Sequence, residues 1–312
     1  MGTFRARPGT STDPGKPDSA GSSVTFAGQL SRPGGRTTAL FGIVVAFAVY
    51  FLLTPWISLA VTAAAHALVA PDVPFADFRT SATRYETPAG LAANGVAIAA
   101  LLVCCWLLMT LFHRAPFGQL SSVDQHLRRG YLVICLGIAV VVVLGGTLLV
   151  GGLQGQPLQF APQEGWWGFL IVVAIVTPWQ SAAEEYLFRG YLLQAVTGVT
   201  TNPWIGAVAS SLLFASIHGA QNTALLLDRF AFGMLASTLA ILTGGLEAGI
   251  AAHITNNVGA YTIAAMTSSV AQVRATQEVS WADALTNITI FAVFALVATA
   301  VCRLLRLPST TN

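Results

Sequence analysis

Charged side chains are scarce in this sequence. Only 9% of the 312 residues are charged, whereas 54% are hydrophobic; an ordinary soluble domain carries about 25% charge. This scarcity excludes an ordinary soluble domain and indicates an integral membrane protein. The net charge is only +2, and Lys16 is the single lysine among the fifteen basic residues. A charge this small and this scattered argues against nucleic-acid binding.

Cysteine is also scarce, and its spacing excludes two further classes of structure. The four cysteines lie inside apolar runs and show no paired spacing, at Cys104, Cys105, Cys135 and Cys302. A disulfide framework and a zinc knuckle both require paired spacing. We therefore expect these thiols to be small apolar groups buried in the membrane domain.

The first 36 residues lack an apolar core. They are rich in Gly, Pro, Ser and Thr, which predicts a flexible cytoplasmic tail and argues against a cleaved signal peptide. The expected organisation is this tail at 1–36, a helical membrane domain at 37–307 and a short C-terminal tail at 308–312.

Long apolar runs dominate the rest of the chain. Hydropathy predicts about eight transmembrane helices and therefore an all-α, polytopic membrane protein. No internal repeat is visible, and Pro and Gly breaks such as "GLQGQP" and "TNPW" separate the runs. The expected segments are 39–68, 89–112, 131–152, 165–196, 203–219, 224–243, 246–268 and 284–305.

The distribution of arginine predicts the orientation. With eight crossings, the basic residues of the N-terminal segment, of the loop at 113–130 and of the C-terminus all fall on one side. The positive-inside rule makes that side cytoplasmic. We therefore expect a plasma-membrane protein with both termini in the cytoplasm.

Three charges interrupt the fourth apolar run, in the stretch "PWQSAAEEYLFRGY". A charge at the centre of a membrane helix costs about 2.5–3.5 kcal/mol, so it is retained for a partner or a function. Glu185 and Arg189 have the i, i+4 spacing of a salt bridge, with the acid first. Glu184 lies about 140° from Arg189 around the helix and has no such partner.

Two other runs carry polar groups at helical spacing. Phe214 and His218 are spaced i, i+4 in the fifth run, and His253 and Asn257 are spaced i, i+4 in the seventh. Each pair therefore shares one helix face. A single histidine on an apolar helix usually satisfies a packing role, but two histidines on separate helices beside a free Glu184 favour a shared site.

These three patterns, in this order, resemble the CAAX prenyl proteases of type II and the related bacteriocin-processing (ABI) enzymes, the CPBP family of intramembrane peptidases. The resemblance covers about residues 160–262, the expected catalytic core. It implies an intramembrane endopeptidase in which Glu184, helped by His218, activates a water, while His253 and Asn257 stabilise the oxyanion. Arg189 and Glu185 would hold the helix, and Phe214 would wall the pocket. We expect the site to open toward the cytoplasmic leaflet.

Alternatives remain open at this stage. No cofactor is favoured, but Glu184, His218 and His253 are also a conceivable zinc ligand set, with the same peptidase activity. A proton-coupled transporter could use the same groups, and a non-catalytic scaffold could keep the same fold. The expected partners are the lipid bilayer and a membrane-associated protein or peptide, either prenylated or carrying a leader, and its identity is open.

Overall fold

The structure is a computed structural model that describes residues 23–31, 35–155, 158–219 and 222–311. Regular secondary structure in these ranges is helical, which confirms the all-α fold class. The first half of the chain contains the 3-10 helix Phe26–Gly28, α1 (Arg36–Ala48), α2 (Thr54–Val69), α3 (Phe75–Thr83), α4 (Pro88–Ala99), α5 (Leu101–Leu107), the 3-10 helix Phe117–Leu120, α6 (Arg129–Ala139) and α7 (Gly145–Leu153).

The second half contains α8 (Trp166–Ile175), α9 (Thr177–Glu185), α10 (Leu193–Thr200), α11 (Pro203–Ile217), α12 (Thr223–Thr243), α13 (Glu247–Thr267), α14 (Val270–Ala275) and α15 (Trp281–Leu304). Four π-helical segments continue neighbouring α-helices without a break, at Val49–Leu53, Leu108–Phe112, Val140–Leu144 and Tyr186–Leu192. The last of these directly follows Glu185.

Six continuous helices of the described residues are long and apolar enough to cross a membrane: Arg36–Val69, Pro88–Phe112, Arg129–Leu153, Trp166–Thr200, Thr223–Thr243 and Trp281–Leu304. The shorter α11 and the more polar α13 lie in the same bundle. The protein is therefore a polytopic membrane protein, while the count of eight crossings stays a prediction.

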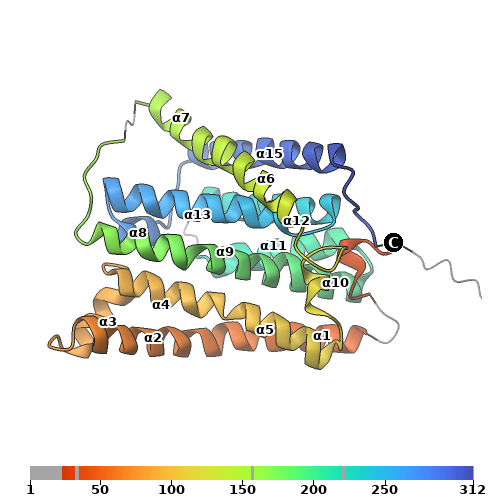
Figure 1. Cartoon of the computed structure of the whole chain (residues 1–312), viewed down its shortest axis with the longest axis horizontal. Coiled ribbons are helices and arrows are strands. Elements are labelled where there is room, and N and C mark those ends of the chain that lie inside the picture. The colour runs from red at the N-terminus through yellow and green to blue at the C-terminus, as the bar shows by residue number, and fades with distance from the viewer. Residues whose placement is uncertain (1–22, 32–34, 156–157, 220–221, 312) are drawn as a thin grey trace, which may run out of the picture.

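The helices pack in layers (Figure 1). The pairs α1–α2 and α4–α5 form one side, α9–α10, α11, α12 and α13 form the middle, and α6–α7 with α15 cover the other side. Large apolar side chains face outward, such as Trp56 at 70% and Leu296 at 72% exposure. Ionised groups are instead buried in the middle layer, which is the arrangement expected when lipid is the solvent.

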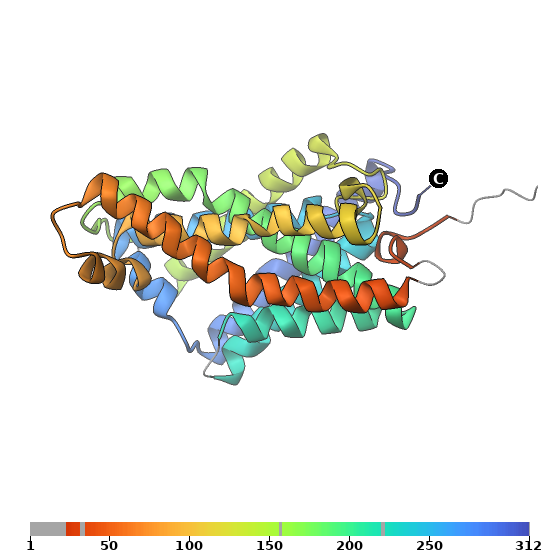
Figure 2. The same cartoon turned by 90° about the horizontal axis from the view of Figure 1, so that it is seen from below.

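Polar residues between the apolar runs cap the starts of α11 and α12. Asn202 accepts a hydrogen bond from the Trp204 amide at the start of α11, and Asn222 accepts one from the Leu225 amide at the start of α12. Pro203 occupies the first turn of α11, where its missing N–H costs nothing. The helices α11 and α12 run side by side, and the end of α11 and the start of α12 lie at the lower edge of the molecule in Figure 2, part-way along its long axis.

The loop before α6 lies against the start of α13. The Leu246 amide donates to the Ser121 carbonyl at 2.9 Å, and the Val123 amide donates to the Gly244 carbonyl at 2.8 Å. The side chain of Leu246 lies beside Gly190, ten residues before α10 ends, or about 15 Å along the helix axis. The α12–α13 turn is therefore set well inside the bundle, and this depth brings α13 level with Glu185.

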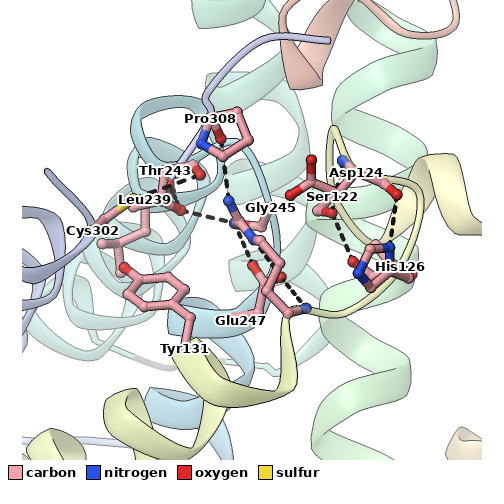
Figure 3. Close-up of polar contacts among 12 residues, drawn as sticks. Ser122, Asp124, His126, Tyr131, Leu239, Thr243, Gly245, Glu247, Cys302 and Pro308 are labelled. Carbon is pink, nitrogen blue, oxygen red and sulfur yellow. Dashed lines mark hydrogen bonds and ion pairs between the residues drawn. The ribbon is translucent and has the colours of Figure 1, made fainter. Parts of the chain in front are cut away.

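A buried ion pair fixes that turn (Figure 3). Arg128 donates to Glu247 from its backbone N and Nε, both at 2.8 Å, and from Nη2 at 2.7 Å, while Nη1 donates to the Pro308 carbonyl at 3.2 Å. Burial alone lowers the pKa of Arg128, but the hydrogen bonds and charge of Glu247 outweigh it and raise the pKa above its ordinary value. Glu247 also lies in the first turn of α13, where the helix dipole favours an anion.

The segments flanking the membrane domain join the same end of the molecule. Residues 23–31, expected to belong to a flexible tail, instead pack: Phe26 and Ala27 are fully buried. The Thr311 amide donates to the Val24 carbonyl at 2.9 Å, so this segment and the C-terminal residues hold each other. Residues 1–22 of the expected tail lie outside the described residues.

Removing one member of the buried pair should destabilise the fold. We expect Glu247→Gln to lower the unfolding free energy by about 3–5 kcal/mol, because it leaves the Arg128 charge buried without its partner. The double variant Arg128→Met, Glu247→Leu should recover most of this loss. Thermal unfolding in detergent measures both, with the exposed Glu164→Gln as control. A Glu247→Gln midpoint equal to that of the control would contradict this role.

Candidate functional site

The predicted pairing of Glu185 with Arg189 is present. Arg189 Nη1 donates to Glu185 Oε1 at 2.9 Å, and both side chains have no exposed surface. The guanidinium also lies over the Phe214 ring, 4.3 Å from its centroid, and 5.5 Å from the centroid of Phe232. A desolvated cation is stabilised by both the carboxylate and the aromatic faces. Phe232 was not expected from the sequence.

His253 lies between the two carboxylates. Its Nδ1 is 2.8 Å from Glu185 Oε1, and its Nε2 is 3.2 Å from Glu184 Oε2. An imidazolium satisfies this arrangement because both of its nitrogens donate, whereas carboxylate oxygens only accept. The cross-helix contact with Glu185 was not expected, and it links both acids to α13. With 3% exposure for both Glu184 and His253, this contact is closed to bulk water.

A glycine permits this approach of α9 and α13. A Cβ at Gly249 would lie 2.9 Å from Glu185 Oε2, which is closer than real side chains tolerate. Gly249 stands one turn before His253 on α13, so the small residue and the histidine face the same neighbour. The i, i+4 spacing of Gly249 and His253 is the feature of the sequence that could have indicated the close contact of α13 with Glu185.

His218 approaches Glu184 from α11. Its Nε2 is 3.9 Å from Glu184 Oε2, beyond direct hydrogen-bond distance. Its Nδ1 is 2.7 Å from the Phe214 carbonyl; since a carbonyl only accepts, Nδ1 carries the proton of that bond. Nε2 is therefore the nitrogen directed at Glu184. The Phe214 ring centroid lies 4.3 Å from that of His218, with the two rings tilted by 44°, and Phe214 lines the cavity beside this histidine.

Two further polar residues of α9 were missed. Gln180 Nε2 donates to Glu184 Oε1 at 3.3 Å, one turn earlier on the same helix, so Glu184 has a neutral partner there but no cation. Ser181 Oγ accepts from Asn257 Nδ2 at 3.3 Å. The i, i+4 spacing of Gln180 and Glu184 could have indicated the first contact, whereas the second depends on how α9 and α13 pack.

These groups line one cavity of about 510 Å³. Glu184, His218, His253 and Asn257 border it, which brings the four predicted catalytic residues together. The cavity extends to Arg274, Thr276 and Val279, in α14 and the segment after it. These lie away from the end that holds the C-terminus and α1 (Figures 1 and 2). The cavity thus faces away from the basic segments, and the expected opening toward the cytoplasmic leaflet is wrong for the predicted orientation.

The zinc ligand set considered from the sequence is not assembled. Among the described residues, no group of three His, Cys, Asp or Glu side chains is placed to hold a metal ion. His253 Nδ1 lies 2.8 Å from Glu185 Oε1, and Nε2 lies 3.2 Å from Glu184 Oε2. The zinc-dependent alternative stays a prediction, because these contacts do not by themselves decide whether Nε2 carries a proton or a lone pair.

The cost of the buried charges can be tested at Arg189. Arg189→Leu should lower the unfolding free energy by about 3–5 kcal/mol, because Glu185 loses its cation in a dry environment. Arg189→Lys should lose less, because it keeps the charge but not the planar group that covers Phe214. Tryptophan fluorescence during thermal unfolding in detergent measures the effect, with the exposed Arg129→Leu as control. An unchanged midpoint for Arg189→Leu would refute the structural role of the pair.

Part of the chain is similar to known proteins. Residues 163–259 match the family described as type II CAAX prenyl endopeptidase Rce1-like. The chain is 35% identical over 164 residues to the uncharacterized protein YyaK of Bacillus subtilis (strain 168), covering 49% of this chain and 54% of that protein. It is 33% identical over 87 residues to an uncharacterized 24.3 kDa protein of Escherichia coli, covering 27% and 39%.

The chain thus spans about half the length of the first relative, and less of the second. The matched segment begins just before α8 and ends in α13, so it contains Glu184, His218, His253 and Asn257. The resemblance drawn from the three motifs is confirmed over these residues. The family matched over these residues is described as an endopeptidase family.

Proposed function

We propose that this membrane protein is an intramembrane endopeptidase that hydrolyses a peptide bond of a membrane-associated protein or peptide. The observation that carries the proposal is the position of Glu184. Its carboxylate borders the cavity and is held by His253 at 3.2 Å, with His218 Nε2 at 3.9 Å on its other side. The segment that builds this arrangement is the one that matches an endopeptidase family.

The gap between Glu184 and His218 suits a water. Two polar atoms 3.9 Å apart make no direct hydrogen bond, but one water can contact both. In the proposed step, Glu184 accepts a proton from this water, and the hydroxide oxygen attacks the carbonyl carbon of the substrate. His218 orients the water through Nε2, because its Nδ1 is already bound to the Phe214 carbonyl.

The same proton transfer changes the role of His253. While Glu184 is ionised, its Oε2 forms an ion-pair contact with His253 Nε2 at 3.2 Å; once Glu184 is protonated, this attraction is weaker. The Nε2–H then donates to the oxyanion that forms on the substrate, together with Asn257 Nδ2–H, whose present bond to Ser181 is 3.3 Å long. Glu184 returns its proton to the leaving nitrogen, the C–N bond breaks and the products are a carboxylate and an amine.

Glu185 and Arg189 act as positioning residues. Glu185 accepts from His253 Nδ1 and so fixes the ring plane that presents Nε2 to Glu184. Arg189 neutralises Glu185 within the same helix. Because Glu185 already has this cation, the imidazolium of His253 can pair with Glu184 as well. We also infer that the protein lies in the plasma membrane and that the end carrying the basic segments faces the cytoplasm.

Loss of the base should abolish hydrolysis. The wild type, in proteoliposomes, is mixed with a library of lipid-anchored peptides, and the products are identified by mass spectrometry. We expect Glu184→Gln to reduce the rate at least 10³-fold, because an amide cannot accept the proton, and His218→Ala at least tenfold. The exposed Glu164→Gln is the matched control. Full turnover by folded Glu184→Gln would refute the assignment, and substrate-independent ion flux by the wild type would favour a transporter.

A metal-free mechanism predicts that chelators leave the rate of hydrolysis unchanged. We expect 1,10-phenanthroline to leave the rate within about twofold of the untreated protein, because no step of the proposed mechanism passes through a metal. Purified active protein should carry zinc below one equivalent. Stoichiometric zinc, with activity lost to the chelator and restored by added Zn²⁺, would replace this mechanism with the metal-dependent one.

A further inference from the structure

The outer part of the cavity contains two arginines without a carboxylate partner. Arg229 of α12 and Arg274 of α14 both line it. The ion pairs among the described residues involve other cations: Arg128, Arg189, His218 and His253. Asp228 borders the same cavity and its charge acts on Arg229, but it forms no ion pair with either guanidinium group. The outer cavity therefore holds two positive charges against one negative charge.

Neutral groups hold the two guanidinium groups in place. Arg229 Nη1 donates to the His218 carbonyl at 2.6 Å. Arg274 donates from Nη1 to the Tyr261 hydroxyl at 3.1 Å and from Nη2 to the Tyr85 hydroxyl at 2.8 Å. Its Cζ lies 4.4 Å from the Tyr85 ring centroid, and its buried Nε has no hydrogen-bond partner among the described residues. Each group is thus oriented but not neutralised.

This arrangement leaves positive charge at the cavity for an anion to bind. Both arginines are partly exposed, and neither forms an ion pair within the part of the chain that the structure describes. A guanidinium offers a planar fork of N–H donors that matches the two oxygens of a carboxylate. Two such groups beside one cavity, when the other arginines of the described residues are paired or exposed, therefore indicate a subsite for a carboxylate.

Both arginines are connected to the proposed catalytic residues. Arg229 bonds to the backbone of His218 itself. Arg274 bonds to Tyr261, which follows Asn257 by one turn on α13, about 6 Å along the helix axis. Both arginines thus contact residues that adjoin the proposed catalytic groups and line the same cavity. A carboxylate bound to them could therefore belong to the same peptide as the scissile bond.

We propose that Arg229 and Arg274 form a subsite that binds a carboxylate of the peptide substrate, close to the bond that is cleaved. The carboxylate is either the free C-terminus of the peptide or an Asp or Glu side chain. The subsite rests on the proposed function for the statement that its ligand is a substrate. It acts on binding, so its loss raises KM more than it lowers kcat.

The test compares three forms of one probe. The probe is an apolar peptide of eight residues with an N-terminal acyl chain and fluorophore, made as the free acid, as the C-terminal amide, and as the amide with one Glu among its last three residues. Fluorescence anisotropy measures binding to the full chain in detergent, in the Glu184→Gln background so that no hydrolysis occurs. Hydrolysis by the wild type is followed in parallel by mass spectrometry.

We expect at least one carboxylate form to bind tenfold or more tightly than the plain amide. Arg274→Gln and Arg229→Gln should each remove most of this preference, and Arg274→Lys should retain part of it. Arg79→Gln, an exposed arginine of α3, is the matched control and should retain all of it. Tyr85→Phe removes one bond that orients Arg274 but keeps the charge; retention of the preference in this variant separates a charge effect from loss of packing.

The outcomes are distinct. Tight binding of the free acid alone assigns the C-terminus, and equal binding of the Glu-containing amide assigns a side chain; both support the subsite. Equal binding of all three forms, or a preference that survives both glutamine variants with an unchanged thermal midpoint, overturns it. A carboxylate preference without hydrolysis by the wild type would refute the proposed function while leaving the subsite in place.

Discussion

The contact of His253 with two carboxylates is the interaction on which the site depends. Glu184 and Glu185 are adjacent in sequence and buried, so their charges would repel across a medium that screens poorly. The imidazole between them contacts both, at 3.2 and 2.8 Å, and Arg189 adds a second cation on Glu185. Two acids and two bases thus form one chain of alternating charge, and the chain can remain in the bilayer because its members neutralise one another.

The depth of α13 makes this contact geometrically attainable. Residue counting from the expected helix ends places His253 only about 10 Å from the start of its helix, much shallower than Glu184. The structure resolves the mismatch by setting the α12–α13 turn inside the bundle, covered by the loop at 117–128 and fixed by the Arg128–Glu247 pair. An ion pair distant from the reaction therefore determines the level at which His253 meets Glu185. The packed residues 23–31 and 308–311 close the same end of the molecule.

Local spacing predicted much of the site, because helical geometry relates residues four apart without tertiary information. It gave the Glu185–Arg189 pair, the shared face of His253 and Asn257, and the position of Phe214 beside His218. Local spacing could not predict contacts between helices, because these depend on how deep each helix lies in the bundle and how it is rotated about its axis. The bonds from His253 to Glu185 and from Asn257 to Ser181 are of this kind. The direction of the cavity was wrong for the same reason, because the short α11–α12 hairpin that shapes it is a feature of packing.

The central claim is that Glu184 activates a water rather than attacking the substrate itself. The most direct measurement is a single turnover in H₂¹⁸O, with the protein in excess over a cleaved peptide. Direct attack by water places one ¹⁸O in the new carboxylate of the product during the first turnover, and this is the result we predict. An unlabelled carboxylate in that first turnover would mean that the oxygen came from the protein, through an acyl intermediate on Glu184, and would contradict the account.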